Sequence, residues 1–292
     1  MKFLVRLVLL CAAAAAVVGG LLIAQRATVT PTMAAPEGRE VAQVPAVSAT
    51  PAVSATPAVS ATPAVSATPA VSATSAAYVP PSQNLNYGAS GAAVTSVQTR
   101  LAQLGYYPGP IDGKYGADMQ QAVWAFKSVQ GLSIAGGASV IGASMRQDLV
   151  NPRPYQALVP AGGPNRVEIN QNIQVLVLYR SNKPFLILHV STGGRYRYCS
   201  NGQCSYAITP DGNYKALSYV PGMIKVPLGW LENPVFFIGR AYAIHGGDPV
   251  PWYPASHGCV RIYADAVNWF HNDVAIGVTN IYVRGTAPSA SA

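Results

Sequence analysis

Hydrophobic residues between positions 84 and 150 recur with the spacing of helices. Two sets of apolar side chains fall on one face of a helix, and each set stops at a glycine, a residue that commonly ends a helix. They are Val94, Val97, Leu101 and Leu104 before Gly105, and Ala122, Val123, Phe126 and Val129 before Gly131. The pattern predicts two helices, the second starting near residue 117, and a shorter third, in a small helical domain over residues 84–150.

Beyond residue 165 the pattern changes to short apolar runs that are typical of strands. Residues 172–179 (NIQVLVLY) and 185–190 (FLILHV) are rich in β-branched and aliphatic side chains and are bounded by turn-forming residues. Within residues 196–206, Asn201-Gly202 is the preferred dipeptide of a two-residue hairpin turn. We therefore expect a mostly β, sandwich-like domain over residues 165–285, which makes the chain an α+β multidomain protein.

The expected hairpin places two cysteines opposite each other. With a two-residue loop, Cys199 faces Cys204, at a Cα separation of roughly 4.5–5.5 Å that permits a disulfide. Zinc binding is the alternative, but two cysteines with no second pair and no histidine cluster beside them disfavour it. The sequence predicts a disulfide here and no metal.

The N-terminus has the pattern of an export signal. Lys2 and Arg6 precede an uncharged apolar run over residues 7–24, which is long for the core of a cleaved signal and about long enough for a tilted membrane span. Residues 1–26 are therefore either a signal peptide or a retained membrane anchor. Basic residues before the run would keep the N-terminus cytoplasmic and place the rest of the chain outside.

A linker that cannot form a core is expected over residues 27–83. Within it PAVSAT recurs without a break from Pro45 to Thr74, and the regular prolines forbid a helix. A β-solenoid is excluded because it needs stacked large apolar residues and ladder donors that proline lacks. The segment is expected to be an extended polyproline-like spacer that reaches on the order of 100 Å. A short disordered tail is expected over residues 286–292.

Residues 245–261 (HGGDPVPWYPASHGCVR) combine cysteine, histidine and glycine in a pattern that suits nucleophilic catalysis. A thiol attacks a carbonyl as its thiolate, and an imidazole can take the proton, so Cys259 and His245 are the natural pair. Glycines such as Gly258 let backbone amides approach a developing oxyanion. An isolated Cys–His pair is more often structural. Cys259, however, is the odd thiol of an exported chain, which is easier to explain by chemistry than by packing.

These residues also carry a family resemblance. Ser256-His257-Gly258-Cys259-Val260-Arg261, preceded by IHG at 244–246 and by ITPDGNY at 208–214, resembles the signature of the L,D-transpeptidases of bacterial cell walls. The resemblance covers roughly residues 166–285. It implies that Cys259 attacks the third residue of a peptidoglycan stem tetrapeptide, releases D-Ala and leaves a thioester. Transfer to an amine would give a 3–3 crosslink, and transfer to water would give L,D-carboxypeptidase activity.

The resemblance also assigns roles around the nucleophile. His245 would be the proton acceptor and donor, and the amides of His257, Gly258 and Cys259 would form the oxyanion hole. The His257 side chain is expected to brace the loop more than to act as a base. The expected substrate-binding residues are Arg261, for a stem-peptide carboxylate, and Ser256, Trp252 and Tyr253. No cofactor is expected.

The helical domain resembles a second family. The segments LGYYPGPIDGKYG at 104–116 and AVWAFKSVQGL at 122–132 are similar to small peptidoglycan-binding domains that are often fused to wall enzymes. The family's second Asp-Gly turn is replaced by Ala135-Gly136, which bears on sugar affinity more than on the fold. This resemblance implies binding to peptidoglycan glycan.

Composition and charge narrow the partners. The chain is 50% hydrophobic and only 10% charged, a bias that lies largely in the N-terminal segments, and its net charge is +8. Nucleic acid is excluded as a partner because the chain is exported and its basic residues are scattered; stem-peptide carboxylates or anionic wall polymers fit better. We expect a location in the cell wall or on the outer face of the membrane, with membrane contact only through the N-terminal segment.

Three other functions compete with crosslinking. The resemblance is also compatible with L,D-carboxypeptidase activity or another peptidoglycan hydrolase activity that uses the same cysteine. It implies inhibition by carbapenem β-lactams. A papain-like endopeptidase has its cysteine before its histidine in the chain. Here His245 precedes Cys259, so the order of the two residues argues against this class of enzyme. A non-catalytic wall-binding protein would not need an intact SHGC sequence.

Overall fold

The computed structural model describes residues 77–107, 109–247 and 249–289, which belong to one compact unit. The expected export segment and the PAVSAT repeats lie outside the described residues. Within the described ranges, no helix combines the length and the apolar character needed to cross a membrane.

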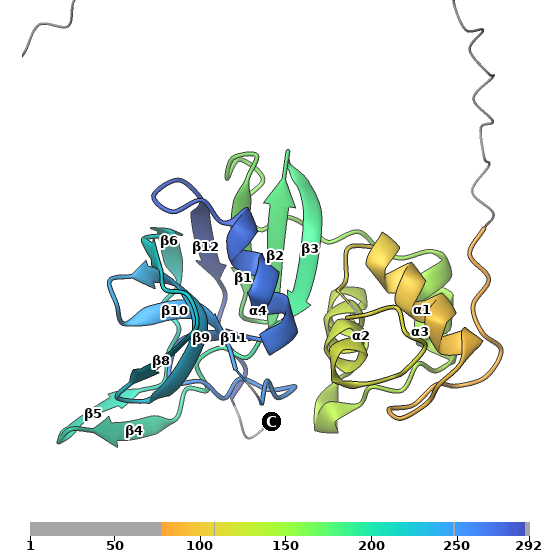
Figure 1. Cartoon of the computed structure of the whole chain (residues 1–292), viewed down its shortest axis with the longest axis horizontal. Coiled ribbons are helices and arrows are strands. Elements are labelled where there is room, and N and C mark those ends of the chain that lie inside the picture. Colours follow the sequence, from red (N-terminus) through yellow and green to blue (C-terminus); the bar gives the residue numbers. More distant parts are fainter. Residues whose placement is uncertain (1–76, 108, 248, 290–292) are drawn as a thin grey trace, which may run out of the picture. The chain divides into compact units, whose positions relative to one another are not determined.

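The helical domain contains the expected two helices and shorter third (Figure 1). They are α1 (Ala92–Gln103), α2 (Ala117–Gln130) and α3 (Ala143–Val150), with a 3₁₀ turn, η1, at Ala135–Gly137. Gly131 ends α2 in the left-handed conformation, with φ 76°, which glycine adopts without steric cost. Val97, Leu101 and Phe126 are fully buried between the helices, so the apolar spacing in the sequence marks the core of this domain.

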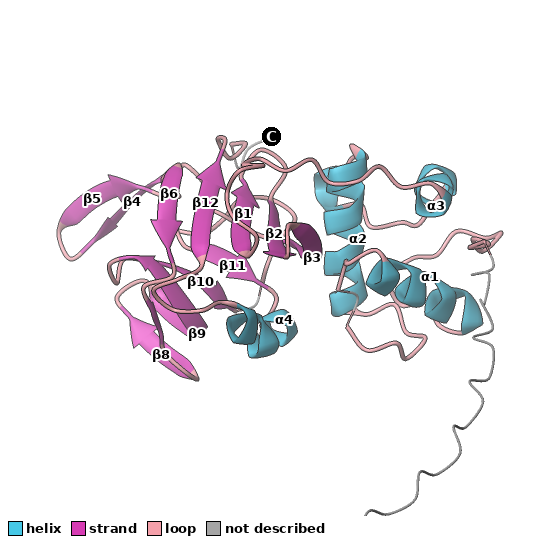
Figure 2. Ribbon diagram, turned by 90° about the horizontal axis from the view of Figure 1, so that it is seen from above, coloured by secondary structure: helices cyan, strands magenta, loops and turns pink. Residues whose placement is uncertain are grey.

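The first sheet of the β domain has five strands in the order β3-β2-β1-β12-β6 (Figure 2). In that order they span Lys183–His189, Val175–Arg180, Arg166–Asn170, Asn280–Arg284 and Gly212–Lys215. β1 and β12 are parallel, and the other neighbours are antiparallel. The expected strands at 172–179 and 185–190 are β2 and β3, so their type is confirmed.

The second sheet has the order β11-β10-β9-β7, with β8 also paired to β9. These strands span Val260–Ile262, Tyr242–Gly246, Gly229–Ile238, Ser218–Tyr219 and Met223–Val226 (β8). Helix α4 (Ala264–Phe270) follows β11, and a 3₁₀ turn, η2 (His271–Asp273), follows α4. Apolar side chains from both sheets and from α4 form one buried cluster, which confirms the sandwich-like arrangement.

The hairpin β4 (Arg197–Ser200) and β5 (Gln203–Tyr206) forms with the expected register. Asn201 and Gly202 both have positive φ, 52° and 77°, as a type I′ turn requires. Cys199 pairs with Cys204, and the two form a disulfide.

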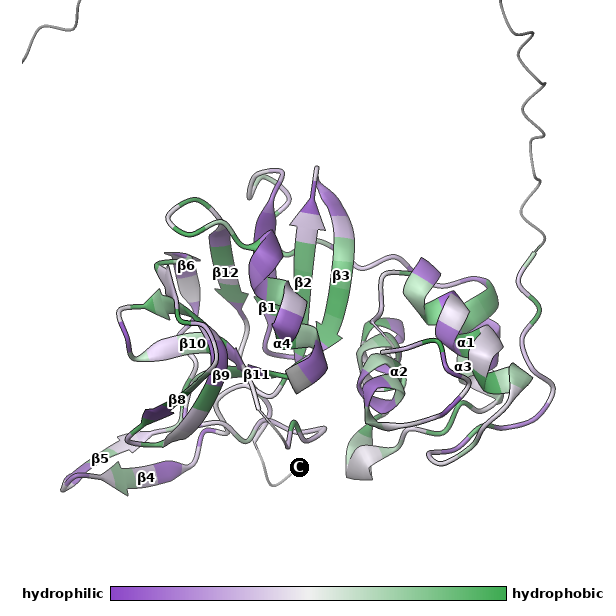
Figure 3. Ribbon diagram, in the orientation of Figure 1, coloured by the Kyte–Doolittle hydropathy of each residue, from purple (hydrophilic) through white to green (hydrophobic). Residues whose placement is uncertain are grey.

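β2 is buried on both faces, which explains its unbroken apolar sequence (Figure 3). Leu176 and Leu178 pack into the core of the β domain. The alternate residues Val175, Val177 and Tyr179 pack into the core of the helical domain instead. The two domains therefore share a continuous apolar contact along this strand.

Residues 286–289, which were expected in the disordered tail, lie against the β domain. The Thr286 amide donates to Asn172 Oδ1 at 2.9 Å, and Ala287 is only 3% exposed. Residues 290–292 are outside the described part of the chain.

Candidate active site

The site is built on the parallel pair β10 and β11. Ile244 pairs with Val260, and His245 pairs with Arg261. Ile244 and Val260 are buried in the core between the sheets, so His245 and Arg261 lie on the opposite face. Cys259 precedes Arg261 by two positions and packs with Ala243 on that same face. The register therefore makes Cys259 and His245 diagonal neighbours, although they are fourteen positions apart in the sequence.

His245 is a buried imidazole held in one orientation. It is 4% exposed, and its Nδ1 lies 2.7 Å from the Gly246 carbonyl oxygen. Because Nδ1–H donates to this oxygen, the lone pair is on Nε2, the nitrogen that can accept a proton. Burial, with a smaller effect from the positive charge of Arg261, lowers the pKa of His245 to about 4. The imidazole is therefore uncharged at neutral pH.

Cys259 is a free, partly buried thiol, and its Sγ lies 3.8 Å from the Ala241 carbonyl oxygen. Burial raises the pKa of the Cys259 thiol, although a hydrogen bond from the Ala243 backbone and the charge of Arg261 act in the opposite direction. The site thus has a neutral thiol and a neutral imidazole on one face of the sheet, and a thiol in this state can attack only with base-assisted deprotonation.

A hydrogen-bonded turn shapes residues 255–259, the loop that carries Cys259 and is called the catalytic loop below. Ser256 Oγ accepts from the Gly258 amide at 3.0 Å and donates to the Cys259 carbonyl oxygen at 2.5 Å. The Gly258 amide, one of the three expected oxyanion donors, is therefore used within the loop. The amides of His257 and Cys259 are the remaining candidates for that role.

Gly258 is required by its surroundings as well as by its backbone. Its φ is 141°, and a Cβ there would lie 2.7 Å from the Tyr242 ring and 2.8 Å from the Ile208 carbonyl oxygen. Larger residues therefore cannot replace it without moving the loop.

Thr209, from the ITPDGNY segment, anchors the same loop. It is 2% exposed, and its Oγ1 donates to the Gly258 carbonyl oxygen at 2.7 Å and accepts from the Gly193 amide at 2.9 Å. Sequence reasoning identified the segment through its resemblance but gave Thr209 no role, because the contact joins residues 49 positions apart.

The His257 side chain packs against the β4–β5 hairpin. The centroid of its ring lies 4.8 Å from the ring centroid of Tyr198 and 5.6 Å from that of Tyr196, and both contacts are edge-on. Tyr196 Oη donates to the Ala255 carbonyl oxygen at 3.3 Å, which ties the hairpin to the catalytic loop. Burial and then the charge of Arg261 lower the pKa of His257. These contacts favour bracing over base catalysis; the tyrosine-rich hairpin sequence was the one signal that could have indicated its place here.

Trp252 and Tyr253 do not join this cluster. Their rings lie 5.3 Å apart, and both line a separate groove of about 350 Å³ against the helical domain.

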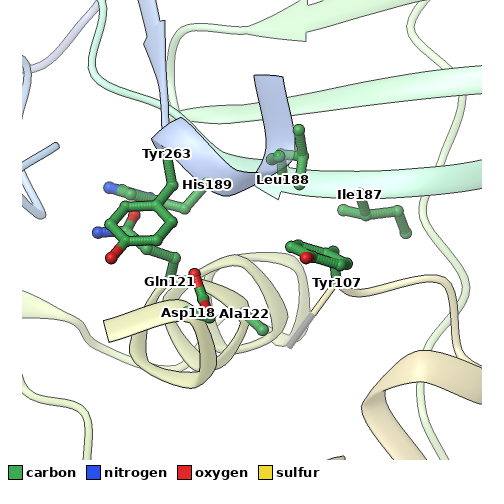
Figure 4. Close-up of a pocket in the computed structure, with 9 residues that line it drawn as sticks. Tyr107, Asp118, Gln121, Ala122, Ile187, Leu188, His189 and Tyr263 are labelled. Carbon is green, nitrogen blue, oxygen red and sulfur yellow. The ribbon is translucent and has the colours of Figure 1, made fainter. Parts of the chain in front are cut away.

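The helical domain supports the segment that leads into the catalytic loop. Gln121 Nε2 on α2 donates to the Val250 carbonyl oxygen at 2.9 Å, and His189 Nε2 lies 2.9 Å from the Pro251 carbonyl oxygen. Figure 4 shows Gln121 and His189 facing each other across the contact between α2 and β3. The cavity there has a volume of about 10 Å³, too small for a substrate, so this contact is structural.

Comparisons with known proteins identify both domains. The family model of the L,D-transpeptidase catalytic domain matches residues 164–283, and that of the peptidoglycan binding domain matches residues 90–137. No curated protein matches the chain.

Three solved structures are similar to the chain. An L,D-transpeptidase from Xylanimonas cellulosilytica is 32% identical with a TM-score of 0.65, and the match covers 70% of this chain and 100% of that one. One from Stackebrandtia nassauensis is 21% identical with a TM-score of 0.39, covering 70% and 97%. One from Mycobacterium smegmatis is 16% identical with a TM-score of 0.34, covering 42% and 59%. Since the solved chain of the Xylanimonas enzyme, its residues 123–326, is 32% identical and matched in full, this chain belongs to the L,D-transpeptidase family, with a peptidoglycan-binding domain before its catalytic domain.

Proposed function

We propose that this cell-wall L,D-transpeptidase forms 3–3 peptidoglycan crosslinks through a thioester on Cys259. The observation that carries the proposal is the register of β10 and β11, which puts the buried, neutral His245 and Cys259, the residue just before β11, on one face of the sheet. Both groups have the protonation state from which base-assisted attack starts.

In the first half-reaction, Cys259 Sγ attacks the carbonyl carbon of the third stem residue while His245 Nε2 takes the thiol proton. The amides of His257 and Cys259 donate to the oxyanion of the tetrahedral intermediate. The C–N bond to D-Ala then breaks, the nitrogen takes the proton from His245, and a thioester remains. Arg261 supplies a positive charge for a stem carboxylate.

In the second half-reaction, an amine of a neighbouring stem attacks the thioester carbonyl carbon. His245 takes a proton from that nitrogen, the C–S bond breaks, and the thiol is restored. Water as the acceptor would give a tripeptide instead, so L,D-carboxypeptidase activity is the second candidate and shares every residue of the site.

The decisive experiment is mass spectrometry of the products from purified disaccharide tetrapeptide. Wild type is expected to give a crosslinked dimer and free D-Ala, and Cys259→Ala is expected to leave the substrate intact. Tripeptide without dimer would assign carboxypeptidase activity. If wild type also left the substrate intact, the proposal would be wrong, and a wall-binding role would take its place.

The location follows from the same domains. A peptidoglycan-binding domain and a transpeptidase domain support association with the cell wall. We propose that residues 1–26 direct export and that the segment over residues 27–83 spaces the domains at 84–150 and 165–285 from the membrane.

A further inference from the structure

A second groove lies between the two domains, separate from the catalytic cluster. Its volume is about 350 Å³, within the range of small-ligand sites. One wall comes from the end of α2 and the following residues, and the other comes from the segment before the catalytic loop and from the C-terminal residues. Its lining comprises Ser128, Gly131, Leu132, Ser133, Ile134, Asn172, Ile173, Gln174, Trp252, Tyr253, Pro254, Pro288 and Ser289.

The chemistry of this lining is uncharged and amphipathic. None of these side chains carries a charge, although the whole chain has a net charge of +8. Aromatic rings at Trp252 and Tyr253 stand beside hydroxyl and amide groups. Flat rings cover the C–H faces of a sugar, and hydroxyl and amide groups bond its polar edge. Stem-peptide carboxylates and wall phosphates would instead require cationic partners.

We propose that this interdomain groove binds the glycan strand of peptidoglycan, through neutral N-acetylated amino sugars. The inference rests on the proposed function, because it supplies the sugar subsite for the same substrate whose stem reaches Cys259. It also moves Trp252 and Tyr253 from the expected peptide site to a sugar site.

The groove is connected to the catalytic loop through a short chain of contacts. Ser191 Oγ donates to the Tyr253 carbonyl oxygen and accepts from the Ala255 amide, both at 2.9 Å. The backbone of Ser191 pairs with Arg261 in turn. A glycan held in the groove would therefore lie beside the loop that presents Cys259, and its stem peptide could extend toward the thiol.

Both domains are needed to form the groove. A Cβ at Gly137 would lie 3.2 Å from Trp252 Cδ1 and 3.7 Å from the Trp124 ring, so the helical domain supports the Trp252 ring directly. This position adjoins the Ala135-Gly136 turn, which lacks the acidic residue of the usual family pattern. Here Trp252, from the catalytic domain, completes the sugar-binding surface.

The test is binding of N-acetylglucosamine tetrasaccharide, which has no peptide, to the full chain by isothermal titration calorimetry. Wild type and Cys259→Ala are expected to bind it equally. Trp252→Ala and Ser133→Trp are expected to lose about tenfold or more in affinity, the first by removing the ring and the second by filling the groove from an exposed position. Trp230→Ala, which removes a 59% exposed tryptophan outside the groove, is the matched control and should bind as wild type does.

Absence of saturable binding, or equal binding by Trp252→Ala, Ser133→Trp and Trp230→Ala, would overturn the inference. Far-ultraviolet circular dichroism of each variant identifies any that fail to fold. If Trp252→Ala fails to fold, Ser133→Trp still tests the groove independently. Cys259→Ala removes the thiol but retains the groove. Sugar binding and crosslinking can therefore be measured independently of each other. Sugar binding by a wild type that leaves the tetrapeptide intact would contradict the proposed reaction and support the sugar site.

Discussion

At the scale of single residues, the site depends on the protonation states of two groups. Burial lowers the pKa of His245 to about 4 and raises the pKa of Cys259. The resting pair is therefore a thiol and an imidazole, in contrast to a preformed thiolate and imidazolium. This distinction can be tested through the pH dependence of reactivity.

Alkylation of Cys259 by iodoacetamide is expected to keep rising with pH above about 8.5, the ordinary thiol value. Only the thiolate reacts, and a raised pKa moves its formation to higher pH. Peptide mass mapping over pH 4–10 measures the rate at Cys259, with free cysteine as the reference. A rate that is level between pH 5 and 8 would instead indicate a preformed ion pair.

Carbapenem acylation should distinguish the two histidines. Wild type is expected to gain the mass of one carbapenem on Cys259, and Cys259→Ala should gain none there. His245→Ala should slow acylation by about 10²- to 10⁴-fold, the usual contribution of a general base. His257→Phe keeps an aromatic ring against Tyr198, so we expect less than about a tenfold change. Equal losses in both variants would contradict the assignment of His245 as the base.

Gly258→Ala should abolish measurable acylation and lower the melting temperature. The added Cβ would collide with the Tyr242 ring and the Ile208 carbonyl oxygen. Gly222→Ala is the matched control, because Gly222 also has positive φ, 79°, but has no atom within 4 Å of the new Cβ. Comparable acylation by wild type and Gly258→Ala would show that the loop tolerates a side chain.

At the scale of elements, the hairpin and the strand pair show how far local sequence reaches. The type I′ turn at Asn201-Gly202 sets the β4–β5 register, so the Cys199–Cys204 disulfide was predictable from eleven consecutive residues. The place of this hairpin beside His257 was not predictable, because it depends on contacts between residues some 60 positions apart.

The disulfide is expected to hold the hairpin against the catalytic loop. In the double variant Cys199→Ser with Cys204→Ser, carbapenem acylation should slow by about fivefold, because Tyr196 and Tyr198 would no longer be fixed beside His257. The melting temperature should change little, since most of the hairpin is exposed. Gln203→Ala in the same hairpin is the control, and an unchanged acylation rate in the double variant would rule out this role.

At the scale of the whole molecule, the two domains are joined by a buried surface. Val175, Val177 and Tyr179 of β2 belong to the helical core, and His189 packs edge-on to Trp124 of α2 at 5.3 Å. The apolar run at 172–179 predicted a strand, but only the folded chain reveals that a helical domain covers its second face. Burial lowers the pKa of His189 to about 4 as well.

Buried neutral histidines should make stability fall in mild acid. An unfolded histidine binds a proton below about pH 6.5, whereas His189 and His245 stay neutral in the fold until about pH 4. Between these values the free energy of unfolding should fall by about 1.4 kcal/mol per pH unit for each such histidine as the pH decreases. Urea titrations from pH 7 to 4 measure this slope. His189→Gln should reduce it, and equal slopes in wild type and His189→Gln would refute the assignment to His189.

The sequence by itself determined the features that depend on neighbours along the chain. These are the helical spacing, the hairpin register and the SHGC motif with its family resemblance, because turn geometry and periodicity act over a few residues. Only the tertiary structure decided the features that depend on burial and on distant contacts. These are the neutral state of His245, the use of the Gly258 amide by Ser256, the anchoring role of Thr209 and the interdomain groove at Trp252. Their physical cause is desolvation and packing between residues that the sequence keeps far apart.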